Sequence, residues 1–348
     1  MGEANAWVVV LGREVAASDA KRVAGAVGEL QPGVALTRGD AWSAIAFADG
    51  RHEDQVEALR SLPGVERVVP VSAPYRLASR EVFETDVAVH IGDDREGASF
   101  DLGGSAPICV VAALGERRRS REERVRLATE VRAAGAAVLL AGRVGHGSGG
   151  GGSDALSVDD LRTLRDVTLD ADLALAAEVS DLRQVDEVAS LVDLVQVGGA
   201  SMQDFNLLRE LGRAERPVVL RRGSGSIVEE FLLAAEYVLT HGNGRAILCE
   251  SGIRTFDATY APRFEINAVP VIKRATHLPV IADPSHATAH PRLVPAVAKA
   301  AVAAGADGLV LELADGPSGD DEAIGMSEFH TLMEELEPIA AAVGRRVR

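Results

Sequence analysis

The stretch that decides the fold is His277-Leu-Pro-Val-Ile-Ala-Asp-Pro-Ser-His286. Its apolar residues 279–282 predict a short buried strand, which the following Asp-Pro pair ends abruptly. Asp283, Ser285 and His286 come directly after that strand. Polar groups in this position are typical of the C-terminal rim of a parallel α/β barrel, because the loops there carry the chemistry while the strands only pack. The alternative is that Asp283 caps a turn and His286 is a surface histidine.

From residue 107 onward, short apolar runs alternate with longer amphipathic segments. Eight strand–helix units predict an α/β fold, a (β/α)₈ TIM barrel, because parallel neighbours need helical crossovers and eight strands can close. A doubly wound open sheet is the alternative, but no Gly-x-Gly-x-x-Gly fingerprint follows the first strand. The predicted strands are Ile108–Ala113, Ala137–Ala141, Leu173–Ala177, Leu194–Val197, Val218–Leu220, Ala246–Cys249, Val280–Ala282 and Gly308–Leu311. The predicted helices are Arg121–Ala134, Val158–Val167, Leu182–Leu191, Met202–Leu211, Ile227–Thr240 and Leu293–Ala304.

Residues 6–72 predict a small module of their own, with the βαββαβ order of a ferredoxin-like domain. Such a module binds an effector, mediates association or serves as a structural appendage, and the sequence does not choose among these. We expect a domain over 1–75, a linker over 76–106 and the barrel over 107–348. The predicted elements are strand Ala6–Leu11, helix Ser18–Glu29 with Ser18 as N-cap, strands Val34–Arg38 and Ser43–Phe47, helix Glu53–Ser61 and strand Val65–Val71.

Composition restricts the partners. A chain of 348 residues is long enough for a barrel of about 250 residues and an appendage. The net charge of −16 argues against nucleic acid and anionic membranes, and no apolar run is long enough to span a bilayer. Only two cysteines, Cys109 and Cys249, occur, both within apolar runs, which suits a reducing cytoplasm. We therefore expect a cytoplasmic protein that acts on a small-molecule substrate.

Polar side chains follow six of the predicted strands. In a barrel these positions converge on one mouth. Each residue taken alone is more often a solvated loop charge, but six in register favour a shared site. They are Glu178, Gln196, Arg221 with Arg222, Glu250, Asp283 with His286, and Glu312.

Two kinds of binding are open to these groups. His286 and Glu312 are residue types that hold a divalent cation, with Asp315, Asp320 or Asp321 as a third ligand; otherwise the first two hydrogen-bond across the mouth. Arg221, Arg222 and Arg254 suit a carboxylate or phosphate, or else pair with Glu178 and Glu250. The glycine-rich run Arg143–Asp154 lacks the Gly-Lys-Ser/Thr ending of a phosphate loop, so it predicts a mobile loop in which His146 is a candidate contributor to the site.

Several motifs resemble one enzyme family, the short bacterial 3-deoxy-D-arabino-heptulosonate 7-phosphate (DAHP) synthases. The N-terminal runs Leu62–Pro70 and Pro74-Tyr-Arg-Leu resemble the ferredoxin-like extension of the same subfamily. The resemblance covers nearly the whole chain. In the barrel it is carried by Glu229–Leu239, Gly242-Asn243, Ile247-Leu-Cys-Glu250, Gly252-Ile-Arg-Thr-Phe256, Ala268-Val-Pro270, His277–His286 and Ala300–Gly308.

The resemblance implies a lyase- or transferase-type enzyme that condenses phosphoenolpyruvate with erythrose 4-phosphate, in a homo-oligomer, a dimer or tetramer. It also implies a divalent metal (Mn, Mg, Co or Zn) held by a cysteine, a histidine, a glutamate and an aspartate. By motif the last three fall on His286, Glu312 and Asp315, which keeps the family's Asp-Gly-Pro context. The cysteine is missing, because the family's Gly-Pro-Cys is Ala112-Ala-Leu114 here and Cys109 comes too early. We therefore expect metal binding to be weakened or lost.

Other departures lie in the family's phosphoenolpyruvate pocket. The Lys-Pro-Arg-Thr motif is Gly145-His-Gly-Ser148 and the arginine before it is Leu140; Gly-Ala-Arg-Asn is Gly198–Ser201; one lysine is Arg221; and one further arginine is Ser251. Each charge-assisted contact to a buried anion is worth roughly 1.5–3 kcal/mol, so the combined loss predicts a changed ligand.

The leading hypothesis is therefore a diverged family member in specialised metabolism, acting on a less anionic hydroxy- or oxo-acid by aldol, retro-aldol, dehydration or enolisation chemistry. Two alternatives stay open: an inactive regulatory partner and a genuine DAHP synthase. In the leading hypothesis Glu178, His286 and His146 are the acid–base candidates, and the substrate-binding candidates are Arg221, Arg222, Arg254, Glu250 and Asp283.

Overall fold

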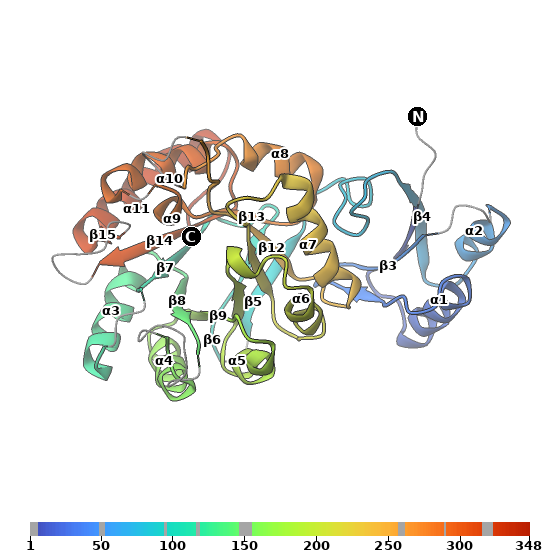
Figure 1. Ribbon diagram of the computed structural model, residues 1–348, viewed down its shortest axis with the longest axis horizontal. Helices are drawn as coiled ribbons and strands as arrows, with labels where there is room; N and C mark the ends of the chain where they lie inside the picture. Colours follow the sequence, from blue (N-terminus) through green and yellow to red (C-terminus); the bar gives the residue numbers. More distant parts are fainter. Residues whose placement is uncertain are drawn as a thin grey trace.

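The structure, a computed structural model, describes residues 6–48, 53–93, 96–115, 119–145, 155–256, 262–288, 290–314 and 323–348. A barrel of strands and helices makes up most of the molecule, and a smaller N-terminal sheet with two helices lies beside it (Figure 1). In the described ranges no helix has both the length and the apolar character needed to cross a membrane. Cys109 and Cys249 are buried, free thiols.

Eight parallel strands close into the predicted barrel. They pair in chain order from β7 to β14, and β14 pairs with β7 to complete the ring. This closure excludes the open-sheet alternative. All eight strands overlap the predicted runs; they are β7 (Cys109–Ala113), β8 (Val138–Arg143), β9 (Ala174–Glu178), β10 (Leu194–Val197), β11 (Val218–Arg221), β12 (Ala246–Glu250), β13 (Val280–Ala282) and β14 (Gly308–Ala314), with a short β15 (Ile324–Gly325) added beside β14.

The barrel strands are apolar throughout because both of their faces are covered. In β7 all five residues are buried. Cys109, Val111 and Ala113 pack inside the barrel, whereas Val110 and Ala112 belong to the layer shared with the helices. Successive residues of β7 thus point to opposite faces of the strand. Because all of them are apolar, the sequence does not show which residue takes which face.

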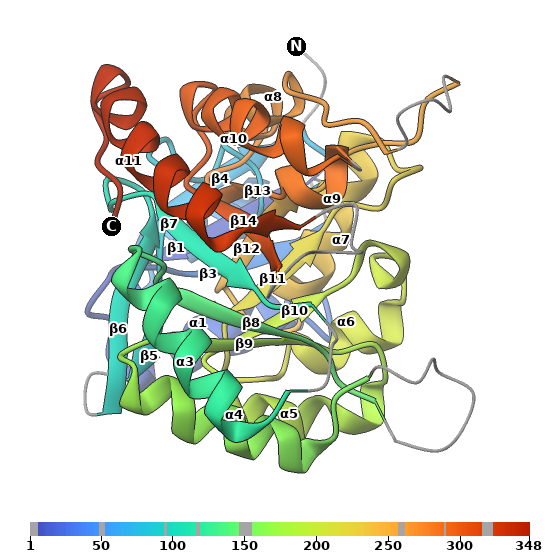
Figure 2. The same ribbon diagram turned by 90° about the vertical axis from the view of Figure 1, so that its left-hand side faces the viewer.

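Helices surround the strands (Figure 2). Two of them begin with the serine signal that the sequence carries: Ser120 and Ser157 form capping boxes with Glu123 and Asp160, each satisfying backbone N–H groups of the first turn. The barrel helices are α3 (Arg121–Ala133), α4 (Val158–Asp170), α5 (Val185–Leu191), α6 (Phe205–Leu211), α7 (Val228–Thr240), α8 (Ala268–Ala275), α9 (Pro284–Thr288), α10 (Val294–Ala303) and α11 (Met326–Ala342).

The segment expected as a linker contains a β-hairpin. Its strands β5 (Ala88–Asp93) and β6 (Glu96–Gly103) pair antiparallel. Ile91, Phe100 and Leu102 are buried in one cluster with the side chains that fill the barrel interior. Since β6 leads directly into the first barrel strand, the hairpin covers the N-terminal end of the barrel, and a ligand must enter from the opposite end.

The N-terminal sheet has the predicted βαββαβ element order, with strands in the spatial order β2-β3-β1-β4. Ser18 as N-cap is wrong, because extended Ala16 precedes the helix and makes no side-chain cap, so Ser18 lies inside the first turn. The second strand is also shorter than predicted, since β2 covers only Thr37–Arg38 whereas the prediction was Val34–Arg38. The elements are β1 (Ala6–Leu11), α1 (Ala17–Leu30), β2 (Thr37–Arg38), β3 (Ser43–Phe47), α2 (Glu53–Arg60) and β4 (Val65–Val71).

Backbone contacts fix the N-terminal sheet to the barrel. The N–H of Arg38 in β2 donates to the carbonyl of Gly242 at 3.0 Å, and the N–H of Gly244 donates to the carbonyl of Arg38 at 2.7 Å. The Thr37 hydroxyl donates to the carbonyl of Leu239 at 2.6 Å. Gly244 must be glycine here, because a Cβ would lie 2.5 Å from the nitrogen of Gly39. These hydrogen bonds and the close backbone packing join the N-terminal sheet to the barrel, and we call this contact between residues 37–39 and 239–244 the seam.

A second junction joins the segment after β4 to the barrel. The rings of Trp42 and Phe83 lie 5.0 Å apart, and the His277 ring stands 4.7 Å from that of Phe83. Glu236 of α7 is buried and accepts hydrogen bonds from the N–H groups of Leu77 and Ala78, at 3.1 and 2.9 Å. Burial raises the pKa of Glu236 above its usual value despite these bonds. The junction thus combines aromatic packing with buried polar contacts.

Candidate active site at the barrel mouth

The predicted site residues lie at the C-terminal ends of neighbouring strands. Glu178, Arg221 and Glu250 are the last residues of β9, β11 and β12. Asp283 follows β13, and Glu312 lies near the end of β14. Because all eight strands run in the same direction, these positions meet at the barrel end that the hairpin leaves open.

Arg221 is the centre of a charged cluster. Its Nη2 lies 2.7 Å from Oδ2 of Asp283, and its Nη1 lies 3.9 Å from Oε2 of Glu178. Gln196 donates its Nε2–H to the same Glu178 oxygen at 3.0 Å. Burial opposes the positive charge, yet the carboxylates of Asp283, Glu178 and Glu312 keep the pKa of Arg221 above its usual value. Arg221 is therefore a permanent cation that binds and orients, and a proton must move through another group.

One donor of Arg221 has no partner. Its Nε is buried and makes no hydrogen bond within the described part of the chain. A buried donor without a partner costs about 1–3 kcal/mol. The side chain itself is 16% exposed, so a ligand at the mouth can reach it.

The stretch His277–His286 is tied into this cluster. Asp283 accepts the N–H of His286 on Oδ1 at 3.0 Å while its other oxygen binds Arg221, so it both caps the short helix α9 and belongs to the site. The Ser285 hydroxyl accepts the N–H of Glu312 at 2.9 Å. Of the three polar residues that follow the strand, Asp283 and Ser285 are buried, whereas His286 is half-buried.

Arg222 and Glu250 form a separate, internal pair. Nη1 of Arg222 lies 2.8 Å from Oε2 of Glu250, and its Nε and Nη2 both donate to the carbonyl of Ser226. Glu250 is 0% exposed, and its other oxygen accepts the N–H of Gly252. Burial raises the pKa of Glu250 even beside Arg222. Arg222 and Glu250 thus satisfy each other's charge inside the protein, and the geometry leaves neither side chain available to bind substrate.

Arg254 stands apart from these arginines. Its side chain is exposed in the loop after β12, and its backbone N–H donates to the carbonyl of Ser224. Two other predicted residues, His146 and Asp315, lie outside the described residues, as does most of the glycine-rich run that contains His146.

Small residues shape the site in ways that the sequence analysis missed. A Cβ on Gly198 would lie 2.7 Å from Oε1 of Glu178, so this position must be glycine to leave room for the carboxylate. A Cβ on Gly115, in the loop after β7, would lie 3.3 Å from Oε1 of Glu312. The signal for both was available, because Gly198 comes directly after β10 and Gly115 comes two residues after the end of β7.

The described residues do not complete a metal site. His286 and Glu312 are the candidate donors, but among the described residues no three His, Cys, Asp or Glu side chains come together around a possible ion. A catalytic metal ordinarily takes three protein ligands. Gly115, in the loop after β7, lies close to Glu312 but has no side chain that could supply a ligand. Cys109 cannot substitute, because it is the first residue of β7 and pairs with Gly308, whereas Glu312 pairs with Ala113 at the other end of the strand.

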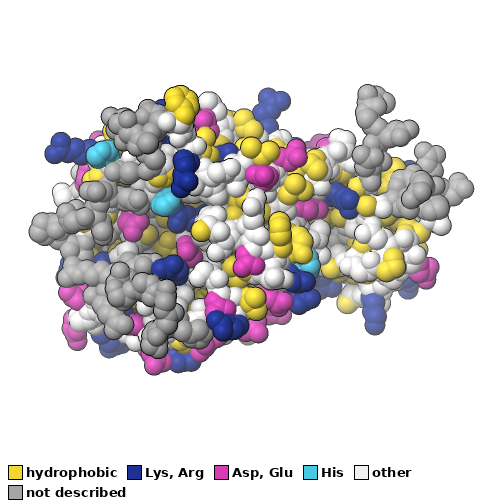
Figure 3. Space-filling model, in the orientation of Figure 1, with side chains coloured by type: hydrophobic (Ala, Val, Ile, Leu, Met, Phe, Trp, Pro, Cys, Tyr) yellow, Lys and Arg dark blue, Asp and Glu magenta, His cyan; other side chains and the backbone are white. Residues whose placement is uncertain are grey.

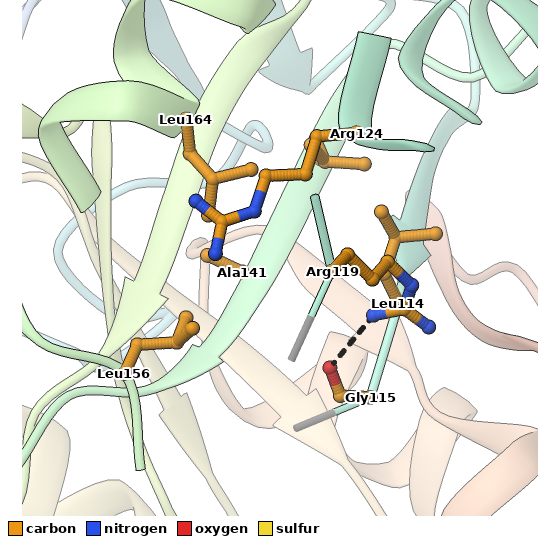
Figure 4. A pocket seen from close by; sticks show the side chains of 8 residues that line it. Leu114, Gly115, Arg119, Arg124, Ala141, Leu156 and Leu164 are labelled. Carbon is orange, nitrogen blue, oxygen red and sulfur yellow. Dashed lines mark hydrogen bonds between the residues drawn. The ribbon is translucent and has the colours of Figure 1, made fainter. Parts of the chain in front are cut away.

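A small cavity beside β7 and β8 is not a substrate site (Figure 4). Its volume is about 20 Å³, room for one water molecule. Arg124 at its wall is already paired with Asp160 at 2.6 Å, and Arg119 donates to the carbonyl of Gly115 at 3.5 Å.

Comparison with known proteins identifies the family. Residues 151–332, more than half of the chain, match the DAHP synthetase I family. The chain is 32% identical over 295 residues to a phospho-2-dehydro-3-deoxyheptonate aldolase of Thermotoga maritima, a match that covers 84% of this chain and 85% of that protein. It is 28% identical over 207 residues to a 2-dehydro-3-deoxyphosphooctonate aldolase of Thiobacillus denitrificans, covering 54% of this chain and 71% of that protein.

Solved structures agree with this result. The crystal structure of the Thermotoga maritima phospho-2-dehydro-3-deoxyheptonate aldolase (DAHP synthase) superposes with a TM-score of 0.74 at 29% identity and covers 99% of both chains. A truncated form of the Thermotoga enzyme gives a TM-score of 0.72 at 30% identity, with 79% of this chain and 99% of that chain covered. On sequence, barrel architecture and matched length together, this chain belongs to the DAHP synthetase I family of enzymes.

Proposed function

We propose that the chain catalyses the aldol-type condensation of DAHP synthases, joining phosphoenolpyruvate to erythrose 4-phosphate at the barrel mouth. The observation that carries this proposal is the 32% identity to the Thermotoga phospho-2-dehydro-3-deoxyheptonate aldolase over 84% of the chain. The comparisons thus favour the DAHP synthase alternative over the changed-ligand hypothesis that the sequence analysis preferred.

In this proposal Arg221 holds an oxygen of the three-carbon acid. Its position at the mouth supports that role, because 16% of its side chain stays exposed although Asp283 and Glu178 lie beside its two terminal nitrogens. Glu178 is the proposed proton-transfer group. Its side chain is 21% exposed, it lies beside Arg221, and its carboxylate is oriented by Gln196. His286, half-buried at the start of α9, is the second acid–base candidate.

The metal of this family is proposed to bind weakly or not at all. The reason is the chemistry of the donors, since neither Leu114 nor Gly115 after β7 supplies a ligand. His286 and Glu312 leave the described donor set incomplete. Activity before and after chelation, with Mn²⁺ added back, tests this point; a strict, tight metal requirement would contradict it.

A second candidate function is the same type of chemistry on a less anionic acid. It is favoured by one specific observation, namely that the Arg222 guanidinium already donates to Glu250 and to the Ser226 carbonyl. Ser251, next to Glu250, is buried, and its hydroxyl donates to the Arg222 carbonyl. The mouth therefore offers few cations for a phosphate.

A substrate comparison separates the two candidates. The purified full-length protein is incubated with phosphoenolpyruvate and erythrose 4-phosphate, and in parallel with pyruvate and unphosphorylated aldehydes, while consumption of the acid is followed. Aldehyde-dependent loss of phosphoenolpyruvate supports the first candidate, and turnover of only the second pair supports the other.

We also propose a cytoplasmic homo-oligomer, a dimer or tetramer, as the family resemblance suggests. Light scattering coupled to size-exclusion chromatography measures the molar mass, and a monomer at micromolar concentration would contradict this proposal.

A further inference from the structure

The seam between the N-terminal sheet and the barrel contains a hollow of about 510 Å³. It lies at the end of the barrel opposite the mouth, because it is formed by the loops that lead into β11 and β12. β2 of the N-terminal sheet contributes Arg38 to the wall. The volume is in the range of small-molecule sites.

The hollow is basic although the whole chain is strongly acidic. Arg38, Arg213, Arg245 and His241 line it, against the single carboxylate of Glu215, whereas the chain carries a net charge of −16. Figure 3 shows basic and histidine side chains together on this face, near the junction of the two parts. Such a local reversal of sign attracts small anions that the rest of the surface repels.

Much of the positive charge is available to a ligand. Arg38 is exposed and pairs with no carboxylate in the described part of the chain. Arg245 donates to the main-chain carbonyl of Glu215, which leaves its charge uncompensated. Arg213 is held only by the exposed Glu210, at 3.0 Å, a type of surface pair worth less than about 1 kcal/mol. Arginine forks bind phosphate and carboxylate oxygens in pairs.

The walls of the hollow are rigid. Asn243 is buried, and its side-chain amide donates to the carbonyls of Leu211 and Arg216, at 3.1 and 2.8 Å. Its side-chain oxygen accepts the N–H of Arg245. Gly212 permits the close approach of the two loops, because a Cβ there would lie 2.5 Å from Cβ of His241. A preformed wall reduces the entropy that binding must overcome.

A neighbouring hollow serves as an internal contrast. It shares Arg213 and Glu215 but is also lined by the carboxylates of Asp93 and Asp186. Its charges are mixed, so it offers no comparable attraction for an anion.

We propose that the basic hollow binds a small multivalent oxyanion, a phosphate ester or polycarboxylate, which bridges the N-terminal sheet and the barrel. Arg38 reaches it from the sheet, and Arg213 and Arg245 reach it from the barrel. Because the ligand contacts both parts, it stabilises their docked arrangement by an amount that grows with the logarithm of its concentration above Kd.

The test uses the full-length protein with pyrophosphate, citrate and inorganic phosphate as probes in isothermal titration calorimetry. We expect pyrophosphate or citrate to bind more tightly than phosphate, and Arg38→Gln/Arg213→Gln to weaken that binding at least tenfold. Arg60→Gln, which removes an exposed arginine from the same N-terminal domain, should leave it unchanged. Pyrophosphate binding that the double variant retains in full would place the anion elsewhere, for example at the mouth, and would overturn the proposal. If none of the three probes binds when it is added at about 10 mM, the proposal is likewise overturned.

Arg38→Lys provides the second arm of the experiment. It keeps the charge while losing the planar fork, and should retain more pyrophosphate affinity than Arg38→Gln. Equal loss in both variants would show that the positive charge kept by lysine does not support binding, and would contradict the electrostatic attraction on which the proposal rests. Since neither arginine belongs to the barrel mouth, turnover of the proposed substrates should be measurable in all variants, which separates this test from that of the proposed function.

Discussion

The junction histidine His277 makes the stability of this fold depend on pH in a defined way. Its ring is fully buried, Nε2 lies 2.8 Å from the carbonyl of Leu77, and Nδ1 is buried without a partner in the described part of the chain. Burial lowers the pKa of His277 to about 4; Arg80 lowers it further, while the Leu77 carbonyl and Asp86 act in the opposite direction. A proton therefore binds the unfolded chain more readily than the folded one.

The sign and size of the effect follow from linkage. Because the folded pKa lies below the ordinary value of about 6.5, the stability is fully present above pH 6.5 and is lost as pH falls toward 4. Between pH 7 and pH 5 the loss from this one group amounts to about 2 kcal/mol. His277→Gln removes the titrating ring while keeping a hydrogen-bond donor for the Leu77 carbonyl.

Urea unfolding at pH 7 and pH 5, followed by tryptophan fluorescence, measures this difference. Trp42 is a suitable reporter because its ring lies 5.5 Å from that of His277. We expect the wild-type free energy of unfolding to fall by about 2 kcal/mol more than that of His277→Gln over this interval. His330→Gln, an exposed histidine on α11, is the control and should behave like the wild type. Equal falls in wild type and His277→Gln would refute the reasoning.

Three further predictions concern the seam and the mouth. Gly244→Ala places a Cβ against the backbone of Arg38 and Gly39 and should cost about 1–3 kcal/mol in thermal or urea unfolding, whereas Gly225→Ala, which meets open space, should be nearly neutral; equal effects would contradict the seam. Glu178→Gln should lower kcat by roughly 10²–10⁴ with little change in stability, because the amide keeps the shape of the carboxylate; steady-state rates and melting temperatures check both parts, and unchanged kcat would remove Glu178 from the mechanism. Asp283→Asn should destabilise the fold by about 1.5–3 kcal/mol, since it removes the charge that faces half-buried Arg221 at 2.7 Å. Glu57→Gln, in an exposed pair with Arg60, is the control and should change unfolding by less than about 1 kcal/mol.

The barrel could be predicted because its strands are buried on both faces. Runs such as Val218–Leu220 and Ala246–Cys249 are continuous apolar stretches between amphipathic helices, a pattern that few other folds produce. The hairpin over 88–103 was read as a linker, although its signal was present. Val89 and Ile91, then Phe100 and Leu102, alternate with polar residues as in a half-buried antiparallel strand. The charged residues between these two pairs interrupt the apolar–polar alternation, so the segment was not predicted as two strands.

The candidate site was predicted only as far as strand ends determine it. A parallel barrel brings Glu178, Arg221 and Asp283 to one mouth, and that requires only the order of elements. The alternative that the arginines pair with Glu178 and Glu250 is observed for Arg221 and Arg222. The pair of Arg221 with Asp283 was not predicted, because the two residues are 62 positions apart in the chain. Two adjacent arginines also differ in a way that sequence does not reveal: Arg221 faces the mouth, whereas Arg222 is consumed by buried Glu250. That distinction depends on alternate side-chain directions at the end of a strand.

The central claim is that the barrel mouth performs the condensation of its family. Mass spectrometry of the product formed from phosphoenolpyruvate and erythrose 4-phosphate tests it most directly. We expect one new acid whose mass equals that of both substrates plus water minus phosphoric acid, formed by the wild type and strongly reduced in Glu178→Gln. Phosphoenolpyruvate that stays intact in the presence of the aldehyde, or equal product in both proteins, would contradict it.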